Sequence, residues 1–293
     1  MRPRISVVIV THNNSGVLDL CLGGVSRQIL KPTETIVVDN GSSDGTPDLV
    51  RQRYPFADLI CLERNHGLTY ARNKGASKAD GDIVVFLDSD AAPYPDWTKN
   101  LLKCCRKSDA CASKMLQYRT GRIDNTGGII QIQRRYHVYP RGWGEEDSGQ
   151  YDSRASATVD CPCGGAMAIW KNTFEELGGF DEAFNCYYDD PDLGLRLRLS
   201  GGMTRYCPGA VVLHLGSATM KSTPEMGRLR EYLLIRNRIR MYIKNLSPGE
   251  YQRALLLDLV HMVGLFIKMD NRALLYTKAL AWNISKILNH EAY

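Results

Sequence analysis

The chain has 293 residues, of which 44% are hydrophobic and 24% are charged. These proportions are typical of a globular protein and exclude a disordered, collagen-like or low-complexity chain, as well as a mini-protein. The net charge of +5 is uneven, because residues 221–293 hold 12 Lys or Arg and 6 Asp or Glu, whereas the rest of the chain is close to neutral. Any functional role of the excess basic residues is therefore expected in the C-terminal quarter of the chain.

Short runs of Val and Ile alternate with helical patterns along the first ninety residues. Strands are predicted at Ile5–Val10, Thr35–Val38, Leu59–Leu62 and Ile83–Leu87, and the apolar residues between them recur at helical spacing. This alternation predicts a doubly wound α/β unit with a mostly parallel sheet. The strand Ile83–Leu87 is apolar throughout, as is typical of a central strand with helices on both faces.

The pattern weakens between about 117 and 160, and we interpret this part as a long, mobile insertion with a candidate hairpin arm at Ile129–Ile132. Strands at Ala166–Trp170 and Ala210–Leu213 follow, with a helix at Pro191–Ser200 between them.

From Pro224 onward the sequence is helical throughout. We therefore predict two domains, an α/β domain at 1–223 and a basic, amphipathic helical region at 224–293.

Nothing at the N-terminus resembles an export signal, because the apolar stretch Ile5–Val10 is too short and is predicted to be a strand. The nine cysteines are an odd number and lack zinc-site spacing. We therefore expect reduced thiols and a cytoplasmic protein rather than a disulfide framework.

Acidic residues directly follow two of the predicted parallel strands. Asp39 follows the second strand, and Asp88 and Asp90 follow the fourth. Ligands of open parallel sheets bind outside the carboxyl ends of the strands. Asp88 and Asp90 offer hard oxygen ligands for Mg²⁺ or Mn²⁺, and His214, after a later strand, is a third candidate ligand. No G-x-G-x-x-G follows the first strand, so a dinucleotide cofactor is not expected.

Each of these residues also has a structural interpretation. Asp is favoured in turns, where it bonds local backbone groups, so a turn is as good an explanation of Asp88 and Asp90 as a metal site. A single His beside an apolar strand is more often structural than a ligand. In the acidic cluster before Leu193, Asp190 suits the N-cap of a helix and Asp192 its first turn.

Several motifs occur in an order that is known from other proteins. They are Val10–Asn13 (VTHN), Val37–Thr46 (VVDNGSSDGT), Asn65–Gly67 (NHG) with Ala71–Gly75 (ARNKG), Leu87–Asp90 (LDSD), and Phe180–Glu182 (FDE) with Asp189–Leu193 (DDPDL). Over roughly residues 4–245 the chain closely resembles the family 2 glycosyltransferases, especially their rhamnosyltransferase-like branch. The resemblance implies the GT-A fold with a C-terminal helical extension.

The resemblance also implies which residues bind the donor nucleotide. Asp39 matches the acid that reads the nucleotide base. Thr11 and Asn13 match residues that line the same pocket. Asn65, Arg72 and Asn73 match the second wall of that pocket. Asp88 and Asp90 match the motif that holds the ribose and the metal.

The same resemblance implies the metal ligands and the base. Asp88, Asp90 and His214 match the ligands of a metal ion, Mg²⁺ or Mn²⁺, that bridges the donor diphosphate. Asp190 matches the general base that deprotonates the acceptor hydroxyl, and a near-normal carboxylate pKa is expected to suffice there. One base and one in-line displacement would invert the anomeric centre. Asp189 stands where the family more often has Glu, which puts an acceptor contact there in doubt.

Three further residues are candidates for the acceptor side, and each also has a structural interpretation. Trp143 lies in the insertion, which is either an acceptor-shaping lid or an ordinary surface excursion. Gly165 either lets backbone approach the sugar closely or makes a turn. Arg236 belongs to an Arg-Asn-Arg motif that recurs in relatives, with an acceptor-side or a packing role, while a solvated helix face is the default interpretation.

The C-terminal region suggests contact with a membrane. The apolar stretch Ala254–Met269 is interrupted by Asp258 and His261, and it is too short for a span of roughly 20 residues. We expect instead a helix in the plane of the membrane, attracted by anionic lipids and helped by Trp282. The protein would then be peripheral on the inner face of the cell membrane, which suits a lipid-linked acceptor.

The leading hypothesis is an inverting, metal-dependent glycosyltransferase of polysaccharide or glycan biosynthesis. It would move a sugar, with rhamnose as one candidate, from a UDP- or dTDP-linked donor to a saccharide or lipid-linked acceptor. The alternative is a sugar-nucleotide-binding or scaffold protein that has lost catalysis. Phosphoryl hydrolysis at Asp88 and Asp90 is a weaker hypothesis, because the Thr and Lys residues that usually act with such a pair are not evident. Nucleic-acid binding is not expected, because the C-terminal Arg residues alternate with Leu and Ile rather than with stacking aromatics.

Overall fold

A computed structural model describes residues 2–131, 135–153, 157–216 and 223–288 of the chain. The chain divides into two compact units. The first comprises Met1–Ile129, Pro140–Asn185 and Asp189–Thr219, and the second comprises Ile130–Tyr139, Cys186–Tyr188 and Met220–Tyr293.

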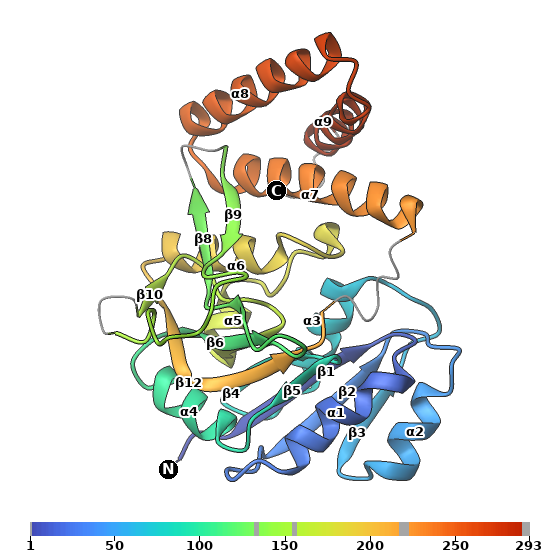
Figure 1. Ribbon diagram of the computed structural model, residues 1–293, viewed down its shortest axis with the longest axis vertical. Coiled ribbons are helices and arrows are strands. Elements are labelled where there is room, and N and C mark those ends of the chain that lie inside the picture. The colour runs from blue at the N-terminus through green and yellow to red at the C-terminus, as the bar shows by residue number, and fades with distance from the viewer. Residues whose placement is uncertain (1, 132–134, 154–156, 217–222, 289–293) are drawn as a thin grey trace. The chain divides into compact units, whose positions relative to one another are not determined.

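A ten-stranded sheet with helices on both faces forms the first unit (Figure 1). Its elements are β1 (Ile5–Thr11), α1 (Ser15–Ser26), β2 (Glu34–Asp39), α2 (Thr46–Arg53), β3 (Ala57–Cys61), α3 (Leu68–Lys78), β4 (Ile83–Asp88), β5 (Ala91–Pro93), α4 (Trp97–Cys105), β6 (Ala110–Gln117), β7 (Ile123–Asn125), β10 (Thr158–Val159), β11 (Ala166–Trp170), α5 (Lys171–Glu176), the 3₁₀ helix η3 (Glu182–Phe184), α6 (Asp189–Leu199) and β12 (Thr204–His214).

The strand order brings the carboxyl ends of the N-terminal strands to one edge. The order is β10-β12-β6-β11-β4-β1-β2-β3, with β5 paired to β12 and β7 to β6. Strands β4, β1, β2 and β3 are mutually parallel, and their register places Thr11 beside Asp39 and Val10 beside Asp88. Strand β11 runs antiparallel between β4 and β6, so it begins at the edge where β4 ends.

The central strands are mostly apolar because both of their faces are covered. Val7 and Ile9 of β1 pack in a core with α1 and α4, whereas Val8 packs in a second core with α3 and α6. Successive side chains of a strand point to opposite faces, so a strand between two helical layers needs no polar side. The prediction of a doubly wound, mostly parallel α/β sheet is therefore confirmed, and the antiparallel strands β11, β5, β7 and β10 complete it.

The insertion predicted at about 117–160 contains short strands. Strand β7 pairs with β6, and β8 (Gly128–Gln131) pairs with β9 (His137–Pro140) in a two-stranded sheet. The predicted hairpin arm is thus confirmed up to Gln131, and Ile132 lies outside the described residues. Buried Lys114 of β6 forms ion pairs with Asp147 at 2.9 Å and Asp152 at 3.0 Å, which hold the following loop against the sheet.

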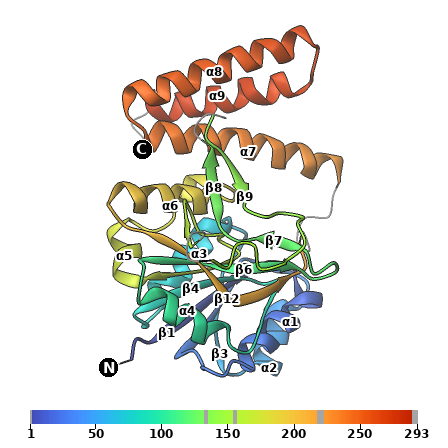
Figure 2. The same ribbon diagram turned by 60° about the vertical axis from the view of Figure 1, so that its left-hand side comes forward.

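Three helices form most of the second unit, as the C-terminal sequence predicts (Figures 1 and 2). They are α7 (Pro224–Asn245), α8 (Pro248–Ile267) and α9 (Arg272–Leu288), and α9 contacts both of the others. Helices α7 and α8 each begin with a proline that follows a Thr or Ser cap, which is a favoured helix start. Within the described ranges, none of the helices is long and apolar enough to span a bilayer.

Candidate functional site

Two buried side chains at the carboxyl ends of β1 and β2 leave polar atoms without a protein partner. Thr11 is 1% exposed and Asp39 is 2% exposed. Within the described part of the chain, neither the Thr11 hydroxyl oxygen nor Asp39 Oδ1 has a hydrogen-bond partner. The other Asp39 oxygen accepts from the Ser42 amide at 3.1 Å, which fixes the carboxylate. Buried polar atoms without partners are unfavourable, so this pair suits a ligand that supplies them.

Three asparagines shape the loops beside this pair. Asn13, in the left-handed region at φ 52°, accepts a hydrogen bond from the Ser43 amide at 2.8 Å. Asn65 accepts from the Asn40 side-chain amide at 3.0 Å, and Asn40 accepts from the His66 amide at 2.9 Å. Asn40 was not among the predicted site residues, although its position directly after Asp39 is a signal that could have identified it.

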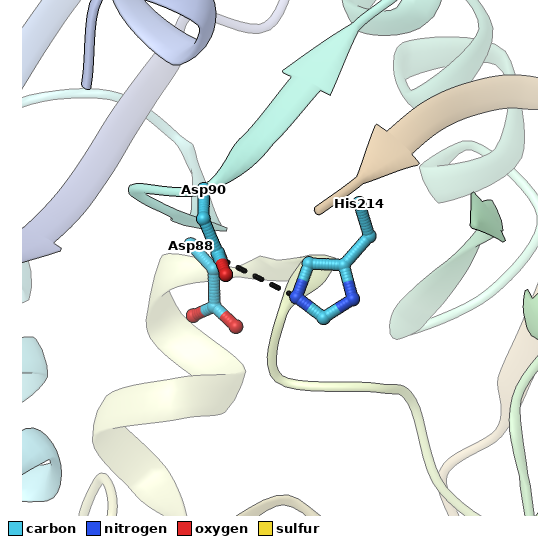
Figure 3. A group of neighbouring side chains, drawn as sticks. All are labelled: Asp88, Asp90 and His214. Carbon is cyan, nitrogen blue, oxygen red and sulfur yellow. Dashed lines mark ion pairs between the residues drawn. The ribbon is translucent and has the colours of Figure 1, made fainter. Parts of the chain in front are cut away.

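Asp88, Asp90 and His214 lie together, as Figure 3 shows. One possible ligand atom from each of them lies within 4.8 Å of the other two. His214 Nε2 is 3.3 Å from Asp90 Oδ1. The antiparallel pairing of β5 with β12 sets His214 opposite Ala91, which explains how residues so distant in sequence meet. Oxygen and imidazole ligands at this spacing fit a divalent cation.

The second ring nitrogen of His214 contacts a residue that the sequence analysis missed. Nδ1 lies 2.9 Å from Asp124 Oδ2. Burial alone would lower the pKa of His214, but the hydrogen bonds to Asp124 and Asp90 outweigh it and raise the pKa to about 10. Metal-bound histidines usually donate their other N–H to such a carboxylate. Asp124 lies in β7, where the weak sequence pattern gave no signal of a role.

A buried arginine of α3 joins the two acidic segments of the site. Arg72 donates to Asp88 Oδ1 at 2.9 Å, to Asp189 Oδ2 at 2.8 Å and to the Gly164 carbonyl oxygen at 2.7 Å. Burial alone would lower the pKa of Arg72, but Asp88, Asp189 and Asp190 raise it. Arg72 thus links Asp88 of the candidate metal group to Asp189 at the start of α6.

Asp190 lies in the first turn of α6, which begins at Asp189, so the predicted N-cap position is wrong by two residues. Asp190 Oδ2 accepts from the Gly164 amide at 2.8 Å. Burial, followed by repulsion from Asp189, raises the pKa of Asp190 to about 7. The sequence analysis expects a near-normal pKa to suffice for the base, and it does not show the burial beside Asp189 that raises the pKa here.

Two other predicted residues have protein partners in this unit. Asp189 is 2% exposed and paired with Arg72, so its carboxylate faces the interior. Asn73 donates to the Phe180 carbonyl oxygen at 2.8 Å and accepts from the Phe180 amide at 2.9 Å, which ties α3 to the segment before η3. The acceptor contact of Asp189 and the nucleotide contact of Asn73 stay predictions.

The remaining candidates for the acceptor side lie in three different settings. Gly165 lies against Asp88, and a Cβ there would be 2.9 Å from Asp88 Oδ2. Trp143 is 65% exposed in the insertion. Arg236 belongs to the second unit, where its guanidinium lies 4.4 Å from the centre of the Trp282 ring. Their acceptor contacts also stay predictions.

The fold and the comparisons together define a glycosyltransferase of the GT-A class. Residues 6–168, more than half of the chain, match the sequence model of glycosyl transferase family 2. The protein belongs to this family.

Relatives and solved structures agree with this assignment. The chain is 27% identical over 235 residues to the N-acetylglucosaminyl-diphospho-decaprenol L-rhamnosyltransferase of Mycobacterium tuberculosis, covering 72% of this chain and 75% of the relative. The structure of GalNAc-T7 with UDP, GalNAc and Mn²⁺ matches with a TM-score of 0.63 and 17% identity, over 83% of this chain and 48% of that one. The mannosyltransferase PcManGT from Pyrobaculum calidifontis, in complex with GDP-Man and Mn²⁺, matches with a TM-score of 0.60 and 20% identity, over 97% and 76%. At these identities the two structures show a shared fold.

Proposed function

We propose that the protein is an inverting, metal-dependent glycosyltransferase of glycan biosynthesis. One hydrogen-bond network is the main support for this proposal. The candidate metal ligand Asp88 and the candidate base Asp190 are joined through Arg72 and the backbone of Gly164. A transferase needs both within one site, because the leaving diphosphate and the attacking hydroxyl lie on opposite sides of the same sugar carbon.

The donor-binding side of the site is proposed from Thr11 and Asp39, at the carboxyl ends of β1 and β2, whose buried oxygen atoms lack partners among the described residues. A uracil or thymine base has an N–H group, and the buried Asp39 carboxylate oxygen lacks a partner among the described residues. The Thr11 hydroxyl is beside it in the strand register. These features support a UDP- or dTDP-linked donor, with rhamnose as a candidate sugar because the mycobacterial relative is named an L-rhamnosyltransferase. The name of that relative also supports a lipid-linked acceptor here, with a free saccharide as the other choice.

Asp88, Asp90 and His214 would hold Mg²⁺ or Mn²⁺, since their ligand atoms gather within 4.8 Å. A cation held there supplies positive charge against the negative charge that develops on the departing diphosphate. Arg72 holds Asp88 in place and partly offsets the repulsion between the site's carboxylates.

The proposed transfer is one displacement. The Asp190 carboxylate takes the proton of an acceptor hydroxyl while that oxygen bonds to the anomeric carbon. The bond from this carbon to the diphosphate oxygen breaks, and its electron pair leaves with the diphosphate. Attack from the face opposite the leaving group inverts the anomeric centre. The Gly164 amide holds one Asp190 oxygen, which orients the base.

We also propose that residues 1–223 form the catalytic domain and 224–293 an accessory helical domain. The protein would act as a peripheral protein on the inner face of the cell membrane. The excess of basic residues after position 220 and the lipid-linked substrate named for the mycobacterial relative support this location.

The test is nucleoside diphosphate release with Mn²⁺, a panel of nucleotide sugars and an acceptor. We expect Asp190→Asn to lose at least about 100-fold in rate, as is usual when a general base is removed, and to keep its affinity for the donor. Asp48→Asn, at an exposed carboxylate of α2, is the matched control and should keep the wild-type rate.

Undiminished turnover in Asp190→Asn would remove the base assignment. If the wild-type protein binds a nucleotide sugar but turns over none of the panel, the protein is a binding protein and the proposal fails.

A further inference from the structure

One side of α8 is apolar and exposed over its C-terminal part, from Leu256 to Ile267. Leu256, Val260, Val263 and Ile267 follow one another at helical spacing and are 60%, 63%, 52% and 78% exposed. We call these four residues the α8 outer face. Polar side chains normally cover the solvent side of a surface helix, so an apolar stripe there is characteristic of a docking surface.

The polar residues that interrupt this stretch in the sequence point elsewhere. Asp258 is fully buried and accepts hydrogen bonds from Arg238 at 2.7 Å, from Arg135 at 2.9 Å and from the Tyr242 hydroxyl at 2.9 Å. The His261 ring packs edge-on against Tyr276 of α9, 5.3 Å between centroids. Asp258 is therefore inside the helical unit, whereas the four residues of the α8 outer face are exposed.

The Trp282 ring is half-buried and lies beside two cations. The guanidinium of Arg236 lies 4.4 Å from the centre of its ring, and the ammonium of Lys286 lies 5.6 Å away. Of the features that the sequence analysis connected with lipid, the α8 outer face has the larger exposed apolar surface.

The charge of this unit identifies the occupant of the face. Residues 223–288 contain 11 Lys or Arg and 5 Asp or Glu. Arg236, Arg238, Arg240 and Asp258 are buried, which leaves 8 basic and 4 acidic residues outside the core. Exposed Arg253 and Lys268 stand at the two ends of the α8 outer face. Pairing with a second copy would bring two basic surfaces together. An anionic lipid surface would instead attract the basic residues while its acyl region accepts the apolar ones.

We propose that the α8 outer face lies in the plane of an anionic lipid bilayer, with Arg253 and Lys268 contacting lipid head groups. Docking in this way would keep the enzyme at the surface where a lipid-linked acceptor is found. The purpose of the docking rests on the proposed function. The evidence for the docking is independent of that function, because it consists of the exposed apolar residues of α8 and the basic residues beside them.

The experiment is flotation of the full-length protein with vesicles of phosphatidylcholine and phosphatidylglycerol, and with vesicles of phosphatidylcholine alone. We expect binding to the anionic vesicles that weakens as salt is added. The double variant Val260→Glu with Ile267→Glu should bind at least about 100-fold more weakly, since it loses two apolar side chains that the bilayer would bury. Arg253→Gln with Lys268→Gln should weaken binding roughly 20-fold, because each basic residue contributes about fivefold.

The matched control is Ile29→Glu, which changes an equally exposed apolar residue (68%) of the first unit and should bind like wild type. Helix content by circular dichroism and turnover on a water-soluble acceptor should be unchanged in every variant. Equal binding by Val260→Glu with Ile267→Glu and by wild type would overturn the proposal. The proposal would also be overturned if the wild-type protein did not bind anionic vesicles. A wild-type dimer that the two glutamate substitutions disrupt would overturn it as well. Loss of turnover with intact flotation would contradict the proposed function alone.

Discussion

At the scale of single residues, Asp190 sets the pH range of the proposed transfer. Burial and the nearby Asp189 raise its pKa to about 7, so below that pH the carboxyl group holds a proton and cannot accept another. We expect turnover to fall about tenfold per pH unit below this pKa, and to level off above it. The measurement is kcat from pH 4.5 to 8.5, with donor binding measured at each pH to separate loss of affinity. An acidic limb near pH 4 would contradict this prediction.

Asp124 is expected to position His214 rather than to touch the substrate. Its carboxylate lies 2.9 Å from Nδ1, so it would keep the hydrogen on that nitrogen when a cation replaces the one on Nε2. Asp124→Asn should weaken Mn²⁺ binding about 10- to 100-fold. Electron paramagnetic resonance of free Mn²⁺ measures this affinity without any turnover. Asp147→Asn, in the neighbouring loop, is the control, and equal affinity in both variants would show that Asp124 has no such role.

At the scale of elements, α3 packs on the sheet without space for one more carbon atom at Gly75. A Cβ there would lie 2.3 Å from Val8 Cγ1 of β1 and 3.1 Å from Val38 Cγ2 of β2. The same close packing brings Arg72, one turn earlier on α3, to Asp88 at the end of β4. The position of the site's arginine therefore depends on a glycine that carries no chemistry.

We expect Gly75→Ala to lower the free energy of unfolding by about 1–3 kcal/mol through overpacking. Gly16→Ala in α1 is the control, because nothing lies within 4 Å of a Cβ there. That variant should be neutral or stabilise by up to about 1 kcal/mol, since alanine favours helix. Urea unfolding followed by circular dichroism gives both values. A stabilised Gly75→Ala would mean that α3 can move away from β1.

At the scale of the whole molecule, each unit has a buried arginine bound to carboxylate. In the first unit Arg72 binds Asp88 and Asp189, next to the proposed chemistry. In the second, Arg238 and Arg135 bind Asp258 among helices α7 to α9. A buried pair adds little net stability, but the loss of one partner is costly. These two networks therefore report on the two units separately.

Asp258→Asn is expected to destabilise the second unit by about 3–5 kcal/mol, because it leaves the Arg238 charge buried without a carboxylate. Hydrogen exchange should show α7 to α9 losing protection, while the central strands β1 and β4 keep theirs. Asp270→Asn removes an exposed ion pair with Arg272 and should change little. Unchanged exchange in α7 to α9 would contradict the importance of this network.

Local patterns in the sequence determined most of the fold. Strands β1, β2 and β4 lie within one residue of their predicted bounds at each end, because strands covered on both faces are mostly apolar and stand out in the sequence. The ordered motifs were sufficient to identify the family, which the comparison confirmed. Asp39 and Asp88 could be placed at one edge, since the ends of parallel strands meet there.

Tertiary structure alone decided the rest, because it depends on contacts between residues far apart in the chain. The direction of β11 could not be seen, since a buried strand has the same pattern whether it runs parallel or antiparallel. The contact of Asp124 with His214 joins residues 90 positions apart. The pKa of Asp190 depends on its burial, and the inward direction of Asp258 depends on Arg238. A sequence pattern fixes the local state of each segment, whereas packing decides which side chains become neighbours and how far water is excluded from them.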